Sequence, residues 1–190
     1  MELKRVVVTG LGAVTPIGNN PEETWNNMLN GVSGAAPITL FDASSFKTQF
    51  ACEVKNLKVN DYIDRKEARK MDRSAQLAII AAMQAMQDSG LNLDEEDKNR
   101  IGVIYGVGIG GIKTFEEEVS YWATHQELGP KFNPFFIPKM IADIAAGHIS
   151  IMYGLHGPNF ATTSACASST NALADAFNLI RLGKANQTCL

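Results

Sequence analysis

The sequence predicts an α/β fold with a parallel sheet. Residues 6–10 and 101–105 are short β-branched and apolar runs without polar alternation, which is typical of strands covered on both faces. Residues 159–163 form a third run that predicts a strand. Longer segments with apolar residues at helical spacing lie between these runs. Strands that alternate with helices in this way indicate parallel strands joined by helical crossovers.

The first half of the chain predicts two helices. Asn20-Pro21 suits the cap and first position of a helix that ends at Gly31. Residues 33–60 are irregular, with one possible strand at 50–54. Residues 71–89 are apolar on nearly every side of the second helix, so we expect this helix inside the molecule.

The second half predicts three further helices. The first lies near residues 114–128 and is followed by a proline-punctuated loop at 129–138. Pro138 suits the first position of the second helix, which extends through Met152. The third helix, at 167–182, follows the last predicted strand directly.

Composition excludes several classes of protein. A chain of 190 residues most simply folds as one domain, and a net charge of −3 predicts no nucleic acid or anionic membrane as partner. Its three cysteines lie far apart, which suits a reducing compartment and predicts neither a disulfide framework nor a metal site. No apolar run approaches the ~18 residues of a membrane helix. We therefore expect a cytoplasmic protein.

Cys166 carries the strongest functional signal, because it lies where a predicted strand becomes a predicted helix. Unpaired N–H groups at a helix start favour a thiolate over a thiol. The neighbouring residues are small and leave room for a bulky thioester: Ser164, Ala165, Ala167 and Ser168. The pattern predicts a nucleophile; the alternative is a buried, inert cysteine. Cys52 lies in an apolar run and is expected to be packed and slow to react.

A glycine-rich run at residues 106–111 follows a predicted strand and fits the spacing of a dinucleotide-binding turn. That motif also requires an acidic residue after a second strand, about 20 residues further on, and here a proline-rich loop follows instead. The glycines are better explained by close approach of the backbone to a ligand or a neighbouring chain.

The basic stretch at residues 65–73 places four cations at helical spacing on one expected face. Such a face is usually only solvated, but on an acidic protein it is a plausible dock for an acidic partner. The four cations are Lys66, Arg69, Lys70 and Arg73.

The three histidines offer no convincing general base. His125 and His148 lie far from Cys166 in sequence, and His156 lies on the loop before its strand. A pair between Cys166 and His156 stays open, but structural or surface roles are favoured for all three.

Several motifs together closely resemble the elongating type II β-ketoacyl-acyl-carrier-protein synthases of bacterial fatty acid synthesis. They keep the family's order and spacing from residue 5 to about residue 184. They are residues 6–12, 15–18, 65–66, 69–72, 106–111, 134–138, 146–148, 152–154, 157–158 and 163–168.

This resemblance implies a thiolase-like layered α/β fold, of which residues 1–190 are an incomplete N-terminal half without a second domain. It implies an acyltransferase that condenses an acyl thioester with malonyl-acyl-carrier protein, loses carbon dioxide and uses an acyl-cysteine. The family needs no cofactor for this reaction and normally forms homodimers.

The resemblance also assigns roles to residues. Cys166 matches the nucleophile, and its backbone N–H matches one donor of the oxyanion hole. Ile109, with Gly108 beside it, matches the lining of the acyl tunnel. The cations that match the dock for acyl-carrier protein are Lys66, Arg69, Lys70 and Lys131.

The family's two catalytic histidines and a supporting lysine lie in a C-terminal half beyond Leu190. Residues 184–190 are expected to replace a buried family strand rather than to form it. Apolar side chains of the last helix are therefore expected to stay uncovered. They are Leu173, Ala176, Phe177 and Ile180. The alternatives are a polyketide-type ketosynthase portion, or a non-catalytic fragment or partner-binding remnant.

Overall fold

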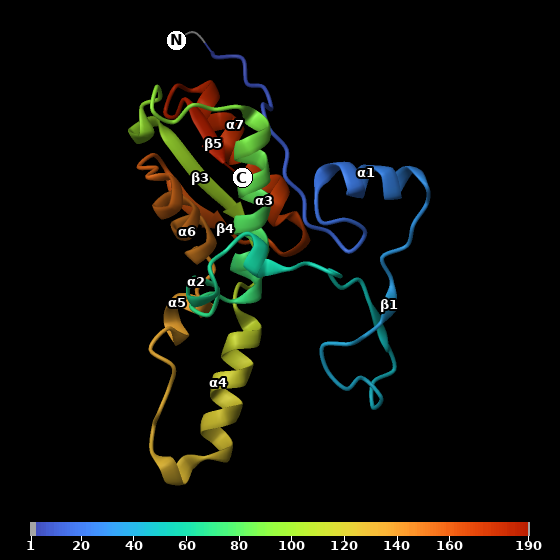
Figure 1. The fold of residues 1–190 in the computed structure, drawn as a ribbon. Helices are drawn as coiled ribbons and strands as arrows, with labels where there is room; N and C mark the ends of the chain where they lie inside the picture. Colours follow the sequence, from blue (N-terminus) through green and yellow to red (C-terminus); the bar gives the residue numbers. More distant parts are fainter. Residues whose placement is uncertain (1–2, 190) are drawn as a thin grey trace.

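The computed structural model describes residues 3–189, and its centre is a three-stranded parallel sheet (Figure 1). The central strand β3 (Ile101–Gly106) pairs with β4 (Asn159–Thr162) on one side and β5 (Gln187–Cys189) on the other. Gly106 is opposite Thr162, and Ile101 is opposite Gln187. The predicted α/β class and the strands near 101–105 and 159–163 are confirmed.

Helices cover both faces of this sheet. On one face, Ile101 and Val103 pack into the main core with α3 (Arg73–Ser89) and α6 (Ile144–Tyr153). On the other face, Ile104 packs against α7 (Ser168–Arg181). Because successive side chains of a strand point to opposite faces, β3 is buried from both sides and reads as a continuous apolar run.

The predicted helix ends follow from local capping. The helix α1 (Pro21–Leu29) begins at Asn20, whose side chain accepts a hydrogen bond from Glu23 N at 2.8 Å. The helix α3 ends at Gly90, which has a left-handed φ of 64°. From Arg73 to Met86 no residue of α3 is exposed, as expected for an internal helix.

Smaller elements connect these parts. The hairpin β1–β2 stands beside α1, away from the sheet, and α4 projects from the body (Figure 1). The remaining strands and helices are β1 (Ala36–Pro37), β2 (Phe50–Ala51), α2 (Arg65–Ala68), α4 (Ile112–Thr124) and α5 (Phe136–Met140). The 3-10 turns are η1 (Val59–Asp61), η2 (Lys98–Arg100), η3 (Gln126–Leu128) and η4 (Ala165–Ala167). Within residues 3–189, no helix has both the length and the apolar character needed to cross a membrane.

The strand expected at residues 6–10 does not form. This segment is extended, but its continuation donates hydrogen bonds to side chains of α3: Leu11 N to Asp88 Oδ2 at 2.8 Å, and Ala13 N to Gln84 Oε1 at 3.0 Å. A groove of about 370 Å³ lies between residues 8–12 and β5. The composition suits a strand, but no described strand pairs with this segment.

The expectation for residues 184–190 was also wrong, because residues 187–189 form the edge strand β5. Its approach is fixed by hydrogen bonds from Asn186 N to Arg100 O at 2.8 Å and from Arg100 Nη2 to Gly183 O at 2.6 Å. These bonds bring the segment alongside β3, where its backbone continues the ladder. As expected, Leu173 and Phe177 of α7 remain 53% and 42% exposed. The same expectation was wrong for Ala176, which is buried against Ile104.

The helix expected from Pro138 through Met152 is two helices, α5 and α6. Pro138 is the third residue of α5 rather than the first. The third position still belongs to the first turn of a helix, where backbone N–H groups have no partner within the helix, so proline fits there. The break follows Met140, whose carbonyl accepts a hydrogen bond from Gly111 N at 3.1 Å. Ile141 then adopts an extended conformation.

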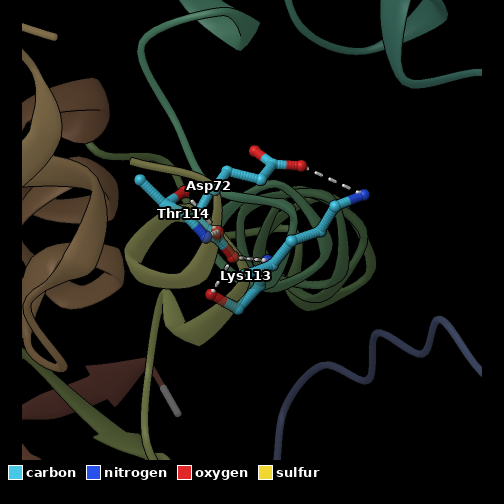
Figure 2. A network of polar contacts seen from close by, with 5 residues as sticks. Asp72, Lys113 and Thr114 are labelled. Carbon is cyan, nitrogen blue, oxygen red and sulfur yellow. Dashed lines mark hydrogen bonds and ion pairs between the residues drawn. The ribbon is translucent and has the colours of Figure 1, made fainter. Parts of the chain in front are cut away.

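Asp72 joins the starts of two helices through a buried carboxylate (Figure 2). Its Oδ1 accepts from Ser74 N at 2.9 Å and caps α3, while Oδ2 accepts from Thr114 Oγ1 at 2.6 Å in the first turn of α4. The ammonium of Lys113 lies instead 3.7 Å from Glu117 Oε1. Burial alone raises the pKa of Asp72, but hydrogen bonds from Thr114 and Ser74 outweigh it, so the pKa lies below its ordinary 3.8.

We predict that Asp72→Asn lowers the unfolding free energy by about 1–3 kcal/mol at pH 7, because an amide N–H₂ would face the donors of Thr114. A carboxylate with a lowered pKa stabilises the fold fully above pH 3.8, and this contribution is lost as pH falls through the folded-state pKa. The difference between the variant and the wild type should therefore shrink in acid.

Urea unfolding at several pH values measures this difference. Asp94→Asn is the matched control, since Asp94 is exposed and its carboxylate has no hydrogen bond to any described residue. Equal stability of Asp72→Asn and the control at pH 7 would contradict the role of Asp72.

Candidate functional site

Cys166 lies in the 3-10 turn η4, between the end of β4 and the start of α7. Its side chain is exposed, so the alternative of a buried cysteine is wrong. Ala165, just before it, has a φ of 49°, a left-handed conformation that residues other than glycine rarely adopt. This sharp turn presents the thiol at the surface in front of α7.

The turn is seated directly on the end of β3. A Cβ atom at Gly106 would lie 2.5 Å from the Cα of Ser169 and 2.7 Å from the carbonyl carbon of Ser168. Only glycine therefore lets the end of β3 approach the first residues of α7 this closely.

Gly108 and Ile109 lie at the same edge of the sheet as Cys166. Because β3 and β4 are parallel, the loops after Gly106 and after Thr162 leave the sheet side by side. Ile109 is 68% exposed and lines a small apolar pocket of about 370 Å³. The other lining residues are Ile112, Phe115, Met140, Ile141 and Ala142.

The end of the glycine-rich run packs against protein backbone. A Cβ at Gly111 would lie 2.2 Å from Lys139 O, and the Gly111 N–H is already bonded to Met140 O. This N–H is not available to a phosphate, so the geometry favours close backbone approach over a nucleotide cradle.

Four of the sequence-predicted docking residues meet around one open pocket of about 850 Å³. Lys66, Arg69 and Lys70 come from α2 and the turn after it, and Lys131 comes from the loop after α4. Lys70 Nζ lies 2.6 Å from Glu67 Oε1 and 5.9 Å from the centre of the Phe135 ring. The remaining lining residues are Glu117, Glu118, Tyr121, Phe132, Asn133, Pro134 and Phe135.

The expectation of one continuous helical face for these cations was wrong. The helix α2 ends at Ala68, and Asp72 caps a new helix, so Arg73 belongs to α3 and does not line the pocket. The three other cations nevertheless stay together, since the N–H groups of residues 69–71 bond to carbonyls of α2 and keep this turn on the end of the helix.

No histidine ring among the described residues hydrogen-bonds to the Cys166 thiol. His156 precedes β4 and Cys166 follows it, so the strand separates the pair that the sequence left open. His125 stacks on Tyr121, with 4.4 Å between ring centres. Burial lowers the pKa of His148, while the negative charge of Glu67 opposes this shift.

Comparison with known proteins assigns the family. A family model described as "Beta-ketoacyl synthase, N-terminal domain" matches residues 3–188. The chain belongs to the β-ketoacyl synthase family. The resemblance inferred from the separate motifs is thereby confirmed along nearly the whole sequence.

Two named relatives of this ketosynthase chain are bacterial. The 3-oxoacyl-[acyl-carrier-protein] synthase 2 of Staphylococcus aureus (strain COL) is 46% identical over 187 residues, which are 96% of this chain and 44% of the relative. The protein of the same name from Synechocystis is 45% identical over 97% of this chain and 44% of its own length. The chain thus spans less than half the length of these relatives.

Solved structures show the same thiolase-like ketosynthase fold. A type II PKS ketosynthase in complex with its acyl-carrier protein and bound to the hexaketide matches with a TM-score of 0.81 and 25% identity. It covers 96% of this chain and 48% of the solved chain. The ishigamide ketosynthase/chain length factor matches with a TM-score of 0.87 and 26% identity over 96% of this chain and 45% of its own.

The sequence analysis missed two residues that support the candidate site. It did not single out Asp72, although an aspartate directly before a helical pattern is a common cap signal. It also passed over Ser168 as one more small residue beside Cys166. The contact between Asp72 and Thr114 spans 42 residues, and no local pattern reveals such a pair.

The expectation that Cys52 is packed was wrong, because the hairpin β1–β2 stands away from the core and leaves Cys52 exposed. Solvent exposure alone therefore does not distinguish the reactivity of Cys166 from that of Cys52. We predict that iodoacetamide labels Cys166 about tenfold faster than Cys52 at pH 7, since only Cys166 lies at the start of a helix of 14 residues.

Peptide mass mapping of partly alkylated, folded protein measures the two rates in one molecule. The buried Cys189 should be slower than both. Labelling of Cys52 as fast as Cys166 would contradict the special reactivity of the turn.

Proposed function

We propose that this chain is the N-terminal portion of a β-ketoacyl-acyl-carrier-protein synthase of fatty acid biosynthesis, and that residues 1–190 fold as one thiolase-like domain. The observation that carries this proposal is the exposed Cys166 on a left-handed turn at the carboxyl edge of a parallel sheet. In open α/β sheets this edge is where ligands bind. The identity of 46% to a 3-oxoacyl-[acyl-carrier-protein] synthase 2 supports the same assignment.

In the proposed reaction, the Cys166 thiolate attacks the carbonyl carbon of an acyl thioester on the carrier. The carbon–sulfur bond to the carrier breaks, the carrier thiolate leaves, and an acyl-cysteine remains. Malonyl-acyl-carrier protein then loses carbon dioxide, and its carbanion attacks the acyl-cysteine and releases the Cys166 thiolate. The Cys166 N–H is the proposed hydrogen-bond donor to the oxyanion in both acyl transfers.

The acyl chain would extend from Cys166 toward Gly108 and Ile109. Two features support this path: the loops after β3 and β4 leave the same edge of the sheet, and the pocket beside Ile109 is lined by apolar side chains. Burial of a hydrocarbon chain there would be favoured by the hydrophobic effect, at about 0.8 kcal/mol per CH₂.

The acidic carrier would dock at the pocket formed by Lys66, Arg69, Lys70 and Lys131. These four cations outnumber the two carboxylates of the lining, Glu117 and Glu118, on a chain of net charge −3. Such local reversal of charge favours an acidic partner. The solved ketosynthase in complex with its acyl-carrier protein supports this type of partner.

We further propose a cytoplasmic homodimer, as the family resemblance implies. Leu128 and Ile137, near the projecting helix α4, are 60% and 55% exposed and would suit burial against a second subunit. The second candidate function is a polyketide-type ketosynthase, favoured by the type II PKS structure at 25% identity. The higher identity of 46% to a 3-oxoacyl-[acyl-carrier-protein] synthase 2 makes fatty acid synthesis the better candidate.

We predict that Lys66→Glu combined with Arg69→Glu weakens binding of an acidic acyl-carrier protein at least about tenfold at low salt. Exposed charges are screened over about 10 Å at 0.1 M ionic strength, so the loss should shrink as salt is added. Titration calorimetry or surface plasmon resonance at two salt concentrations measures both effects.

The matched control is Lys47→Glu combined with Lys184→Glu. It changes the net charge equally, but both lysines are exposed and lie outside the pocket. Equal weakening by the two double variants would mean that only net charge affects binding. The pocket cations would then be an ordinary solvated surface and not a docking site.

A further inference from the structure

We propose that Ser168 is a positioning residue whose hydroxyl clamps the Cys166 turn. The proposal rests on the proposed nucleophilic role of Cys166 and goes beyond it, because the Ser168 hydroxyl bonds to neither the thiol nor any residue on the proposed path of the acyl chain. Its side chain acts on the backbone on either side of the turn.

The hydroxyl of Ser168 is buried and fully used. Ser168 is 3% exposed, and its Oγ accepts a hydrogen bond from Ser164 N at 2.9 Å and donates one to Ala165 O at 2.8 Å. One oxygen atom thus holds the amide before the turn and a carbonyl within it. Buried polar groups that complete both bonds fix local geometry strongly.

The hydrogen bonds of Ser168 stabilise an unfavourable backbone conformation at Ala165. Ala165 lies between the two bonded groups and has a φ of 49°, which its Cβ disfavours. A residue in such a conformation persists only where its surroundings impose it. Here the bond from Ser168 Oγ to Ala165 O fixes the orientation of the peptide group that leads directly into Cys166.

The same hydroxyl does not serve as a helix cap. Ser168 is the first residue of α7, and the capping residue Ala167 offers no side-chain hydrogen bond. The helix is anchored elsewhere, by Ala172 and Ala176 against Ile104. Loss of the hydroxyl should therefore disturb the turn more than the helix.

Two further contacts hold Ser168 and the turn in place from the strand side and the helix side. Thr162 Oγ1, at the end of β4, donates to Ser168 O at 2.8 Å. Asn171 Nδ2, one turn into α7, donates to Ser164 Oγ at 2.5 Å. With Gly106 seated below, the Ser168 hydroxyl occupies a fixed position from which it can act on the turn.

The test compares Ser168→Ala with Ser169→Ala. Ser169 is the next residue, and it is exposed with a hydroxyl that bonds to no described residue. The Ser169→Ala variant therefore loses the same hydroxyl oxygen as Ser168→Ala but breaks no hydrogen bond of the turn. The measurement is the ratio of the alkylation rates of Cys166 and Cys52 in the same folded molecules. General loss of stability would raise both rates together, whereas loss of the clamp changes Cys166 alone.

We expect the ratio of the Cys166 rate to the Cys52 rate to fall about tenfold or more in Ser168→Ala. It should stay at the wild-type value in Ser169→Ala and return to that value in Ser168→Thr, which keeps the hydroxyl. An unchanged ratio in Ser168→Ala would overturn the clamp. A wild-type Cys166 no faster than Cys52 would instead contradict the proposed nucleophile itself, and with it the purpose of the clamp.

Hydrogen exchange in the wild type tests the clamp without any variant. The amide of Ser164 should exchange slowly, because its N–H is bonded to Ser168 Oγ although the Ser164 residue itself is exposed. Rapid exchange of this amide under native conditions would overturn the proposal even if Ser168→Ala fails to fold.

Discussion

The parallel pairing of β3 with β4 is the constraint on which the rest of the site depends. Its register places Gly106 opposite Thr162, so both strands end together and their loops leave the same edge of the sheet. This brings the turn of Cys166 and the segment of Ile109 to one side of the molecule. It also seats the first residues of α7 on the end of β3, where Gly106 permits contact between the two backbones.

Asp72 extends this organisation to the charged surface. By joining the starts of α3 and α4, it fixes the turn that carries Arg69 and Lys70 relative to the helix that carries Glu117 and Glu118. The helix α4 also contributes Ile112 and Phe115 to the apolar pocket. The buried carboxylate of Asp72 therefore positions α4, which lines both the proposed docking pocket and the proposed acyl-binding pocket.

Most of the fold could be predicted from the sequence where the cause is local. Helix ends at Asn20 and Gly90, and the doubly buried strand β3, follow from capping and apolar pattern. The wrong predictions concern segments whose structure depends on pairing with residues far away in the sequence. Residues 6–10 have the composition of a strand but no strand beside them, and residues 187–189 lack that composition yet pair with β3.

The candidate site follows the same division. Cys166 was found because its position between a predicted strand and a predicted helix is a local signal, and the basic residues because they cluster in the sequence. Ser168 and Thr114 act through hydrogen bonds that only the folded turn and the packed helices create. The exposure of Cys52 depends on a hairpin that stands away from the core. Local pattern does not determine such placement.

The central claim is that the Cys166 turn accepts an acyl group. The most direct measurement is mass spectrometry of the folded full chain after incubation with acyl-acyl-carrier protein, followed by mapping of the modified peptide. The account predicts one acyl group, attached as a hydroxylamine-sensitive thioester at Cys166 and absent in Cys166→Ala. An acyl group that maps to Cys52, or one that persists in Cys166→Ala, would contradict it.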